Sequence, residues 1–137
     1  MVYSIGEAAE KLNLPKSTIR YYDKEGLLPF IERRESGIRM FAESDISMLQ
    51  VIECLKNTGM SIKDIKKFSE WCLKGDLTLK ERYELFLERK QSVKEQIEEL
   101  QKSQNLIEHK CWYYKTALEA GTESIHKNIS DHDNNSN

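Results

Sequence analysis

Residues 4–28 read SIGEAAEKLNLPKSTIRYYDKEGLL, and this stretch predicts two short helices separated by a tight break. Ser4 and Glu7 have the S-x-x-E spacing of a capping box, which marks the start of the first helix. Asn13 tolerates a left-handed conformation and can therefore end that helix. Pro15 disfavours helix at the residue before it and favours a helix start after it. Gly26 suits the position just beyond the second helix.

The second of these helices is predicted to present a polar face to solvent. Ile19 and one of the two tyrosines can face inward, which leaves cationic, hydroxyl and aromatic side chains outside. Such a combination suits a DNA groove, because cations and hydroxyls bind phosphates and base edges. The predicted DNA contacts of this helix are Lys16, Ser17, Thr18, Arg20, Tyr21 and Tyr22.

Two extended segments, residues 27–34 and 38–41, are predicted to follow, with a turn at Gly37. Phe30, Ile31 and Phe41 favour strand, and a glycine suits the turn between two strands. A hairpin directly after such a helix pair is the wing of a winged helix-turn-helix. We expect its basic residues to meet phosphates or the minor groove; these are Arg33, Arg34 and Arg39.

Two more helices are predicted between residues 43 and 75, each ending at a glycine. From residue 79 to residue 118, apolar residues recur at alternating steps of four and three, with Lys90 and Gln104 as the polar exceptions. This spacing of 3.5 residues is typical of a coiled coil, and a helix of this length needs a partner helix to bury its apolar stripe. We therefore expect a homodimer, held by Tyr83, Phe86, Val93, Ile97, Leu100 and Ile107.

Composition and charge narrow the function class. The chain has 137 residues, a formal net charge of −2 and a pI of about 6.0, so its overall charge does not indicate nucleic acid. Residues 16–39 nevertheless carry a local excess of basic residues. No catalytic set of Ser, His, Cys or carboxylate residues is found, so we do not expect an enzyme. No stretch is long and apolar enough for a membrane span or signal peptide, and we expect a cytoplasmic protein that binds no membrane.

The cysteines and histidines do not predict a metal site, and no cofactor is expected. Cys54, Cys72 and Cys111 are odd in number, widely spaced and without a C-x-x-C pair, which favours reduced thiols. Cys54 has two interpretations: a reactive sensor thiol near Lys56, or a small apolar residue of the core. Residues 121–137 are poor in large apolar side chains and are expected to be a disordered tail.

At several motifs the chain resembles the MerR family of bacterial transcription regulators. The motifs are Ser4-Ile5-Gly6-Glu7-Ala8-Ala9, Thr18-Ile19-Arg20-Tyr21-Tyr22-Asp23, Gly26-Leu27-Leu28-Pro29, Gly37-Ile38-Arg39 and Gly59-Met60-Ser61-Ile62. The resemblance implies a mostly α fold: a winged helix-turn-helix head and second helix pair over residues 1–75, then a dimerisation helix over residues 76–120 that forms an antiparallel coiled coil. It also implies that Lys63 lies near a DNA phosphate.

The same resemblance implies a function. The expected partners are double-stranded promoter DNA and RNA polymerase at the promoter, and the expected action is distortion of an overlong promoter spacer. The segment around Cys54 is similar to a branch that responds to aldehydes, nitrosative agents or other electrophiles, so a stress response is expected. The alternatives are control by a non-covalent ligand, constitutive DNA binding without an effector, and, more remotely, a coiled-coil scaffold.

Overall fold

The computed structural model describes residues 1–33 and 39–127, and it divides into two compact units, residues 1–92 and 93–137. Each unit is considered by itself. The predicted turn at Gly37 and the predicted contact Arg34 lie outside the described residues, as does the end of the predicted tail. Among the residues that are described, no helix is both long enough and apolar enough to span a membrane.

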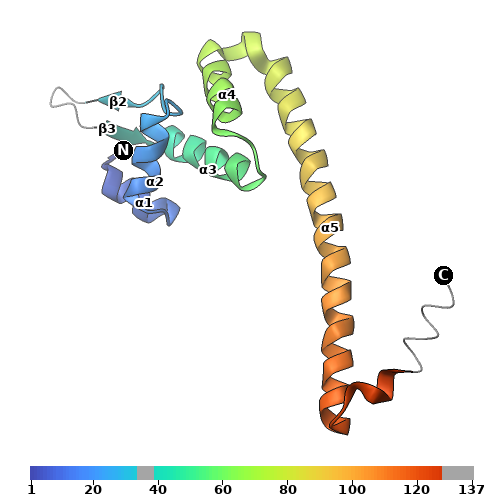
Figure 1. Ribbon diagram of the computed structural model, residues 1–137. Coiled ribbons are helices and arrows are strands. Elements are labelled where there is room, and N and C mark those ends of the chain that lie inside the picture. Colours follow the sequence, from blue (N-terminus) through green and yellow to red (C-terminus); the bar gives the residue numbers. More distant parts are fainter. Residues whose placement is uncertain (34–38, 128–137) are drawn as a thin grey trace. The chain divides into compact units, whose positions relative to one another are not determined.

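The first unit contains the two predicted helices, α1 (Ile5–Leu12) and α2 (Lys16–Lys24), which pack against each other (Figure 1). The capping box is formed: the Ser4 hydroxyl accepts the Glu7 N–H at 3.2 Å, and the Glu7 carboxylate accepts the Ser4 N–H at 3.0 Å. Asn13 ends α1 in the left-handed conformation, with φ 54°. These local signals fix where α2 begins relative to α1, as the sequence predicted.

A small antiparallel sheet lies beside the helix pair, with strand order β1–β3–β2. The strands are β1 (Val2–Tyr3), β2 (Glu32–Arg33) and β3 (Arg39–Ala42). The first extended segment is shorter than predicted, because Leu27 and Leu28 are buried in the core instead of forming strand. The sequence did not indicate β1, since two residues are too few for an alternating pattern.

The helices α3 (Glu43–Asn57) and α4 (Ile62–Lys74) complete the head. The Asp45 carboxylate accepts the Ala42 N–H at 2.7 Å, and the Ser61 hydroxyl accepts the Asp64 N–H at 3.1 Å, so both helix starts are capped. One apolar core joins all these elements. Its fully buried large side chains include Ile19, Leu27, Leu28, Phe41, Leu49, Ile52, Leu55 and Ile65.

The long helix α5 (Leu79–Ala120) begins within the first unit, after the short 3-10 helix η1 (Gly75–Thr78). The Phe86 ring packs edge-to-face on the buried Phe68 ring of α4, with ring centroids 5.5 Å apart. Arg82 donates to the Gly75 carbonyl at 2.7 Å and so ties α5 to the turn before it. The first compact unit therefore includes the first turns of α5.

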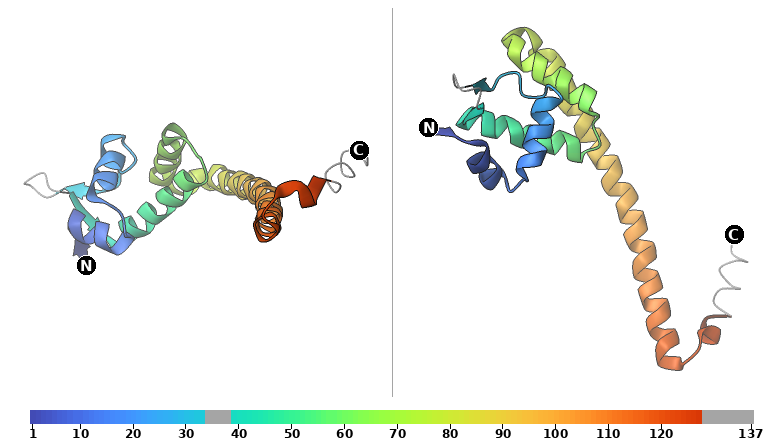
Figure 2. Two further views of the ribbon diagram at one scale, coloured as in Figure 1. Left: turned by 60° about the horizontal axis from the view of Figure 1, so that its bottom comes forward. Right: turned by 60° about the vertical axis from the view of Figure 1, so that its left-hand side comes forward.

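In the second unit, the chain turns at Gly121 after α5, and the 3-10 helix η2 (Glu123–His126) lies against the last turns of α5 (Figure 2). His126 is 4% exposed and stacks on the Tyr113 ring, with centroids 4.2 Å apart. Its Nε2 is 3.0 Å from the Tyr113 carbonyl oxygen. The prediction of a disordered tail from residue 121 is therefore wrong for residues 121–127, because one histidine among aromatic rings supplies the missing burial.

Candidate nucleic-acid interface

The helix α2 has one buried side and one exposed side. Ile19 and Tyr22 are three residues apart and both are 0% exposed, so this side packs on the core. The side chains that point outward share the opposite face at the spacing i, i+3, i+4 and i+7; they are Ser17, Arg20, Tyr21 and Lys24. This face combines two cations, a hydroxyl and a phenol, which is the chemistry of a DNA-binding surface.

Lys24 was not among the predicted contacts. It follows Arg20 by four residues and is exposed at the last turn of α2. The sequence carried the signal, since the helical spacing from Ser17 includes residue 24, but the distinctive Arg-Tyr-Tyr motif ends before it.

Tyr22, in contrast, does not lie at this surface. Its ring is fully buried, its hydroxyl donates a hydrogen bond to the Glu53 carboxylate of α3, and the Lys56 Nζ lies 5.6 Å from its ring centroid. Burial and the Glu53 carboxylate both raise the pKa of the Tyr22 phenol, so it stays protonated. The prediction of Tyr22 as a DNA contact is therefore wrong: of two adjacent tyrosines on a helix, only one can face outward, and that one is Tyr21.

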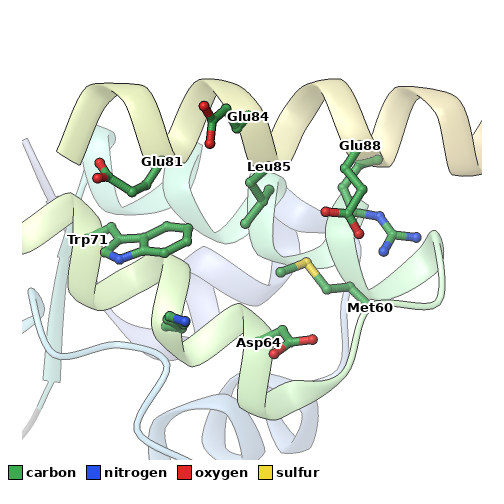
Figure 3. Close-up of a pocket in the computed structure, with 9 residues that line it drawn as sticks. Met60, Asp64, Trp71, Glu81, Glu84, Leu85 and Glu88 are labelled. Carbon is green, nitrogen blue, oxygen red and sulfur yellow. The ribbon is translucent and has the colours of Figure 1, made fainter.

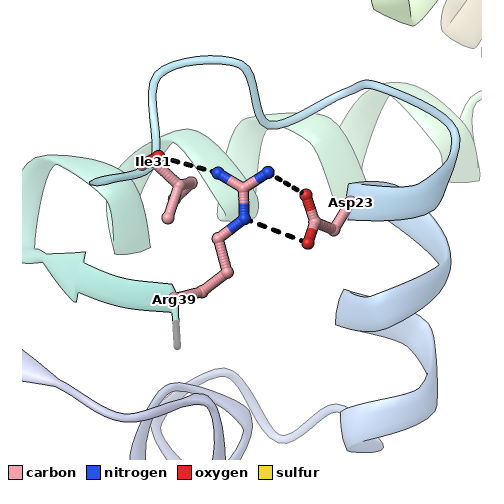
Figure 4. A network of polar contacts seen from close by, with 3 residues as sticks. All are labelled: Asp23, Ile31 and Arg39. Carbon is pink, nitrogen blue, oxygen red and sulfur yellow. Dashed lines mark hydrogen bonds and ion pairs between the residues drawn. The ribbon is translucent and has the colours of Figure 1, made fainter. Parts of the chain in front are cut away.

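Arg39 joins the sheet to α2. Its Nε and Nη2 donate to the two Asp23 carboxylate oxygens at 3.0 and 2.5 Å, and its Nη1 donates to the Ile31 carbonyl at 2.7 Å (Figure 4). Both side chains of the ion pair are about one-fifth exposed. All three guanidinium nitrogens of Arg39 therefore donate hydrogen bonds within the molecule. The bidentate contact with Asp23 positions β3 relative to α2.

The other predicted DNA contacts differ in exposure. Lys16 and Lys63 are exposed at the starts of α2 and α4, and Thr18 is half-buried. The backbone of Arg33 lies in β2, whereas Arg34 lies outside the described residues. The structure brings Lys16 and Thr18 to the same helix as Arg20, while Lys63 comes from a separate helix.

The three cysteines lie in different environments. Cys54 is exposed on α3, so its interpretation as a core residue is wrong for the single chain. Its neighbours Glu53 and Lys56 both contact Tyr22, Glu53 through a hydrogen bond and Lys56 through its ammonium group near the ring. Cys72 is half-buried, and burial raises the pKa of its thiol while Arg82 opposes the shift. Cys111 is exposed on α5. Within residues 1–33 and 39–127, no group of three or more His, Cys, Asp or Glu side chains is arranged to hold a metal ion.

Most residues of the predicted dimer seam are exposed in the single chain. Ile97, Leu100 and Ile107 are 60%, 70% and 61% exposed, and they follow one another along one stripe of α5, as in an interaction surface. Tyr83 is likewise exposed, and Val93 is half-buried. Phe86 is 41% exposed because part of its ring packs on Phe68. The apolar stripe of α5 thus continues along a surface that residues 1–33 and 39–127 leave uncovered.

Comparison with known proteins gives a consistent result over most of the chain. Residues 3–70 match the family described as "MerR HTH family regulatory protein", and residues 46–109 match the one described as "MerR, DNA binding". An uncharacterised HTH-type transcriptional regulator of Haemophilus influenzae is 46% identical over 122 residues, which is 89% of this chain and 90% of that protein. The regulator AdhR of Bacillus subtilis is 33% identical over 64% of this chain and 63% of that protein.

Solved structures of similar chains agree with this. The crystal structure of HiNmlR, described as a MerR family regulator lacking the sensor domain and bound to promoter DNA, superimposes with a TM-score of 0.84. It is 45% identical, and the match covers 91% of this chain and 99% of that one. A MerR family regulator from Bacillus thuringiensis matches with a TM-score of 0.77 and 42% identity, over 81% of this chain and 97% of that one.

Proposed function

The chain belongs to the MerR family of DNA-binding transcriptional regulators, and from this premise we propose that it binds double-stranded promoter DNA as a homodimer and acts with RNA polymerase at the promoter. The observation that carries the proposal is the outward face of α2, with Ser17, Arg20, Tyr21 and Lys24 together opposite the buried Ile19. We call α2 the recognition helix from here on. That HiNmlR is bound to promoter DNA supports this assignment.

The proposed DNA contacts fall into two groups, one suited to base edges and one suited to phosphates. Arg20 and Tyr21 lie at the centre of the outward face, where an arginine can bind a guanine edge bidentately. Lys16, Ser17, Thr18 and Lys24 flank them and are suited to phosphates, as is Lys63 at the start of α4. Arg33 and Arg34 of the wing complete the proposed contact set.

The dimer follows from the apolar stripe of α5. Two such stripes paired as an antiparallel coiled coil would cover Ile97, Leu100 and Ile107, and would set the distance between two recognition helices. The proposed domain division keeps residues 1–75 as the DNA-binding head and residues 76–120 as the dimerisation helix. The dimer then acts by indirect readout, distorting an overlong spacer between the two promoter elements that polymerase recognises.

The test of DNA binding is fluorescence anisotropy with a duplex of the chain's own upstream region. Arg20→Ala should weaken specific binding by about 30- to 20,000-fold if a dimer loses ~1–3 kcal/mol at each of two half-sites. Glu98→Ala, an exposed change far along α5, is the control and should bind as the native protein does. Unchanged affinity of Arg20→Ala at moderate salt would remove Arg20 from the interface.

We further propose that an aldehyde or another electrophile acts on Cys54. Exposure makes the thiol accessible, and Glu53 and Lys56 on either side of it contact Tyr22 of the recognition helix. An adduct at Cys54 would change the packing beside these contacts and so favour one orientation of α2 over another. A shift from a mostly inactive to a mostly active population requires ~5 kcal/mol of preference.

The electrophile proposal is tested by in vitro transcription. Cys54→Ser should keep the DNA affinity and lose the response to formaldehyde and nitrosating compounds, whereas Cys72→Ser and Cys111→Ser should keep both. A Cys54→Ser protein that still responds normally would remove Cys54 from the mechanism. The remaining candidates would then be a non-covalent effector or DNA binding without an effector.

A further inference from the structure

A cavity of about 320 Å³ lies in the first unit, between α4 and the first turns of α5. Its floor is apolar: Met60, Trp71 and Leu85 lie in a row between the two helices (Figure 3). Met60 is almost fully buried, while Trp71 and Leu85 are half-buried and so keep part of their surface open to the cavity. None of these residues belongs to the proposed DNA-binding face or to the apolar stripe.

The rim of the cavity is acidic. Four exposed carboxylates line it, one from α4 and three from α5, namely Asp64, Glu81, Glu84 and Glu88. Two cations, Lys67 and Arg89, also line it, so four carboxylates against two cations leave a formal charge of −2. The Arg89 guanidinium is partly engaged, because its Nη2 donates to the Thr58 carbonyl at 3.1 Å and to the Ser92 hydroxyl at 2.9 Å. Its buried Nε has no hydrogen-bond partner among the described residues.

The face of Trp71 already attracts a positive charge. The Nζ of Lys67, one turn earlier on α4, lies 5.5 Å from the Trp71 ring centroid, which is within the range of a cation–π interaction. Lys67 is exposed and long, so a ligand can displace its ammonium group into solvent at little cost. The aromatic face is thus a place where a cation is favoured within this cavity.

The cavity should stay open when α5 pairs with a second copy. Tyr83 and Lys90 occupy positions in the apolar stripe of α5. Tyr83 lies two residues after Glu81, and Lys90 lies two residues after Glu88. Two residues correspond to about 200° around an α-helix. The carboxylates therefore lie on the side of α5 away from the proposed dimer seam.

We propose that this cavity binds an organic cation, a substituted ammonium whose charged head lies over Trp71 and whose apolar groups contact Met60 and Leu85. The acidic rim disfavours anions, and the aromatic floor has less attraction for a neutral group of the same shape. A bare metal ion does not fit, since in the part of the chain that the structure describes the carboxylates do not converge into a metal-binding group. The proposal concerns binding alone and does not depend on the proposed function.

The experiment measures binding to the full chain without DNA. Choline is the probe, and 3,3-dimethylbutan-1-ol, which has the same shape without the charge, is the comparator. The chain has two tryptophans, so Trp112→Phe leaves Trp71 as the only tryptophan whose fluorescence is followed. Choline should change this fluorescence saturably at low ionic strength, and the alcohol should bind at least about fivefold more weakly.

Two exposed sites make the test specific to the cavity. Lys67→Gln removes the competing ammonium group and should strengthen choline binding by about two- to fivefold, whereas Lys74→Gln at the end of α4 should have no effect. The double variant Glu84→Gln with Glu88→Gln should weaken choline binding by about three- to tenfold, whereas Glu98→Gln should leave choline binding unchanged. All these side chains are exposed, so the variants should fold.

Three outcomes would overturn the proposal. One is the absence of a saturable change with choline, and another is equal affinity for choline and the alcohol. The third is a Lys67→Gln protein that binds choline more weakly than the parent, since Lys67 would then hold the ligand instead of competing with it.

Discussion

The hydroxyl of Tyr22 in α2 donates a hydrogen bond to the carboxylate of Glu53 in α3. This contact joins the recognition helix to the residue directly before Cys54, and the Lys56 ammonium over the Tyr22 ring adds a second contact between the same two helices. A tyrosine of the Arg-Tyr-Tyr motif thus connects the proposed sensor segment with the proposed DNA-binding face. Its role is to position α2 and not to touch DNA.

Tyr22→Phe and Tyr21→Ala should separate the roles of the two tyrosines. Tyr22→Phe removes a partly buried hydrogen bond to a charged group while keeping the ring, so the free energy of unfolding should fall by about 1–3 kcal/mol. Its affinity for the upstream duplex should change little. Tyr21→Ala, at a side chain that is 44% exposed, should leave stability nearly unchanged and weaken DNA binding. Urea unfolding measures the change in stability, and fluorescence anisotropy measures the change in DNA affinity. If Tyr22→Phe weakened DNA binding and Tyr21→Ala lowered stability, Tyr22 would be the DNA contact and Tyr21 the positioning residue.

Asp23→Asn should weaken DNA binding although Asp23 itself is not a proposed contact. The change breaks the bidentate pair with Arg39 and releases β3 from α2, at a cost to stability of about 1 kcal/mol for a pair that is only partly buried. Arg39→Lys keeps the charge but loses the planar guanidinium that binds both Asp23 oxygens. It should therefore weaken DNA binding almost as much as Asp23→Asn does.

A comparison of Asp23→Asn with Arg39→Ala shows whether Arg39 only positions β3 or also contacts DNA. If Arg39 acts by positioning, Asp23→Asn and Arg39→Ala should lower the affinity by similar factors, and the double variant should lose little more. Additive losses in anisotropy titrations would show that Arg39 also binds a phosphate, as the sequence predicted.

Replacing Ile97 and Leu100 with Asp should abolish the dimer. Both side chains are more than half exposed in the single chain, so the monomer should tolerate the change, whereas four like charges in a buried seam could not be paired. Sedimentation velocity should give a monomer with native helix content by circular dichroism. A stable dimer would place the seam on another face of α5, and Glu98→Asp with Gln101→Asp is the control on that helix.

The three thiols should react with iodoacetamide at different rates. Cys54 is exposed and should be alkylated first. Cys72 should be slowest, because it is half-buried and its raised pKa leaves less thiolate at neutral pH. Cys111 lies at a stripe position and should react faster in the Ile97→Asp, Leu100→Asp variant than in the native dimer. Peptide mass spectrometry over time gives the three rates, and a protected Cys54 would contradict its proposed sensor role.

Local signals predicted much of the head. The capping box at Ser4, the left-handed Asn13 and the break at Pro15 depend on residues only a few positions apart, so the sequence alone indicates them. The apolar spacing along α5 is the same kind of short-range pattern.

What the sequence could not supply were contacts between distant segments. Helical spacing left open which tyrosine faces inward, and the answer depends on Glu53 lying thirty-one residues further along the chain. The burial of His126 required the aromatic rings of α5 to be in place, and the pairing of Arg39 with Asp23 required the sheet to lie beside α2. Side-chain chemistry identifies candidates at these positions, but only the packed structure decides between an internal partner and DNA.

The contact between Asp23 and Arg39 also holds β3 in a fixed position relative to α2. If α2 reads the major groove and the wing reaches the neighbouring backbone, the two footprints are held at one separation, because neither element can shift without breaking several bonds of one guanidinium. Inserting one base pair between the footprints moves them apart by about 3.4 Å and rotates them by about 35°. The protein would then act as a molecular ruler, tolerating base changes within a footprint better than any change in the spacing between footprints.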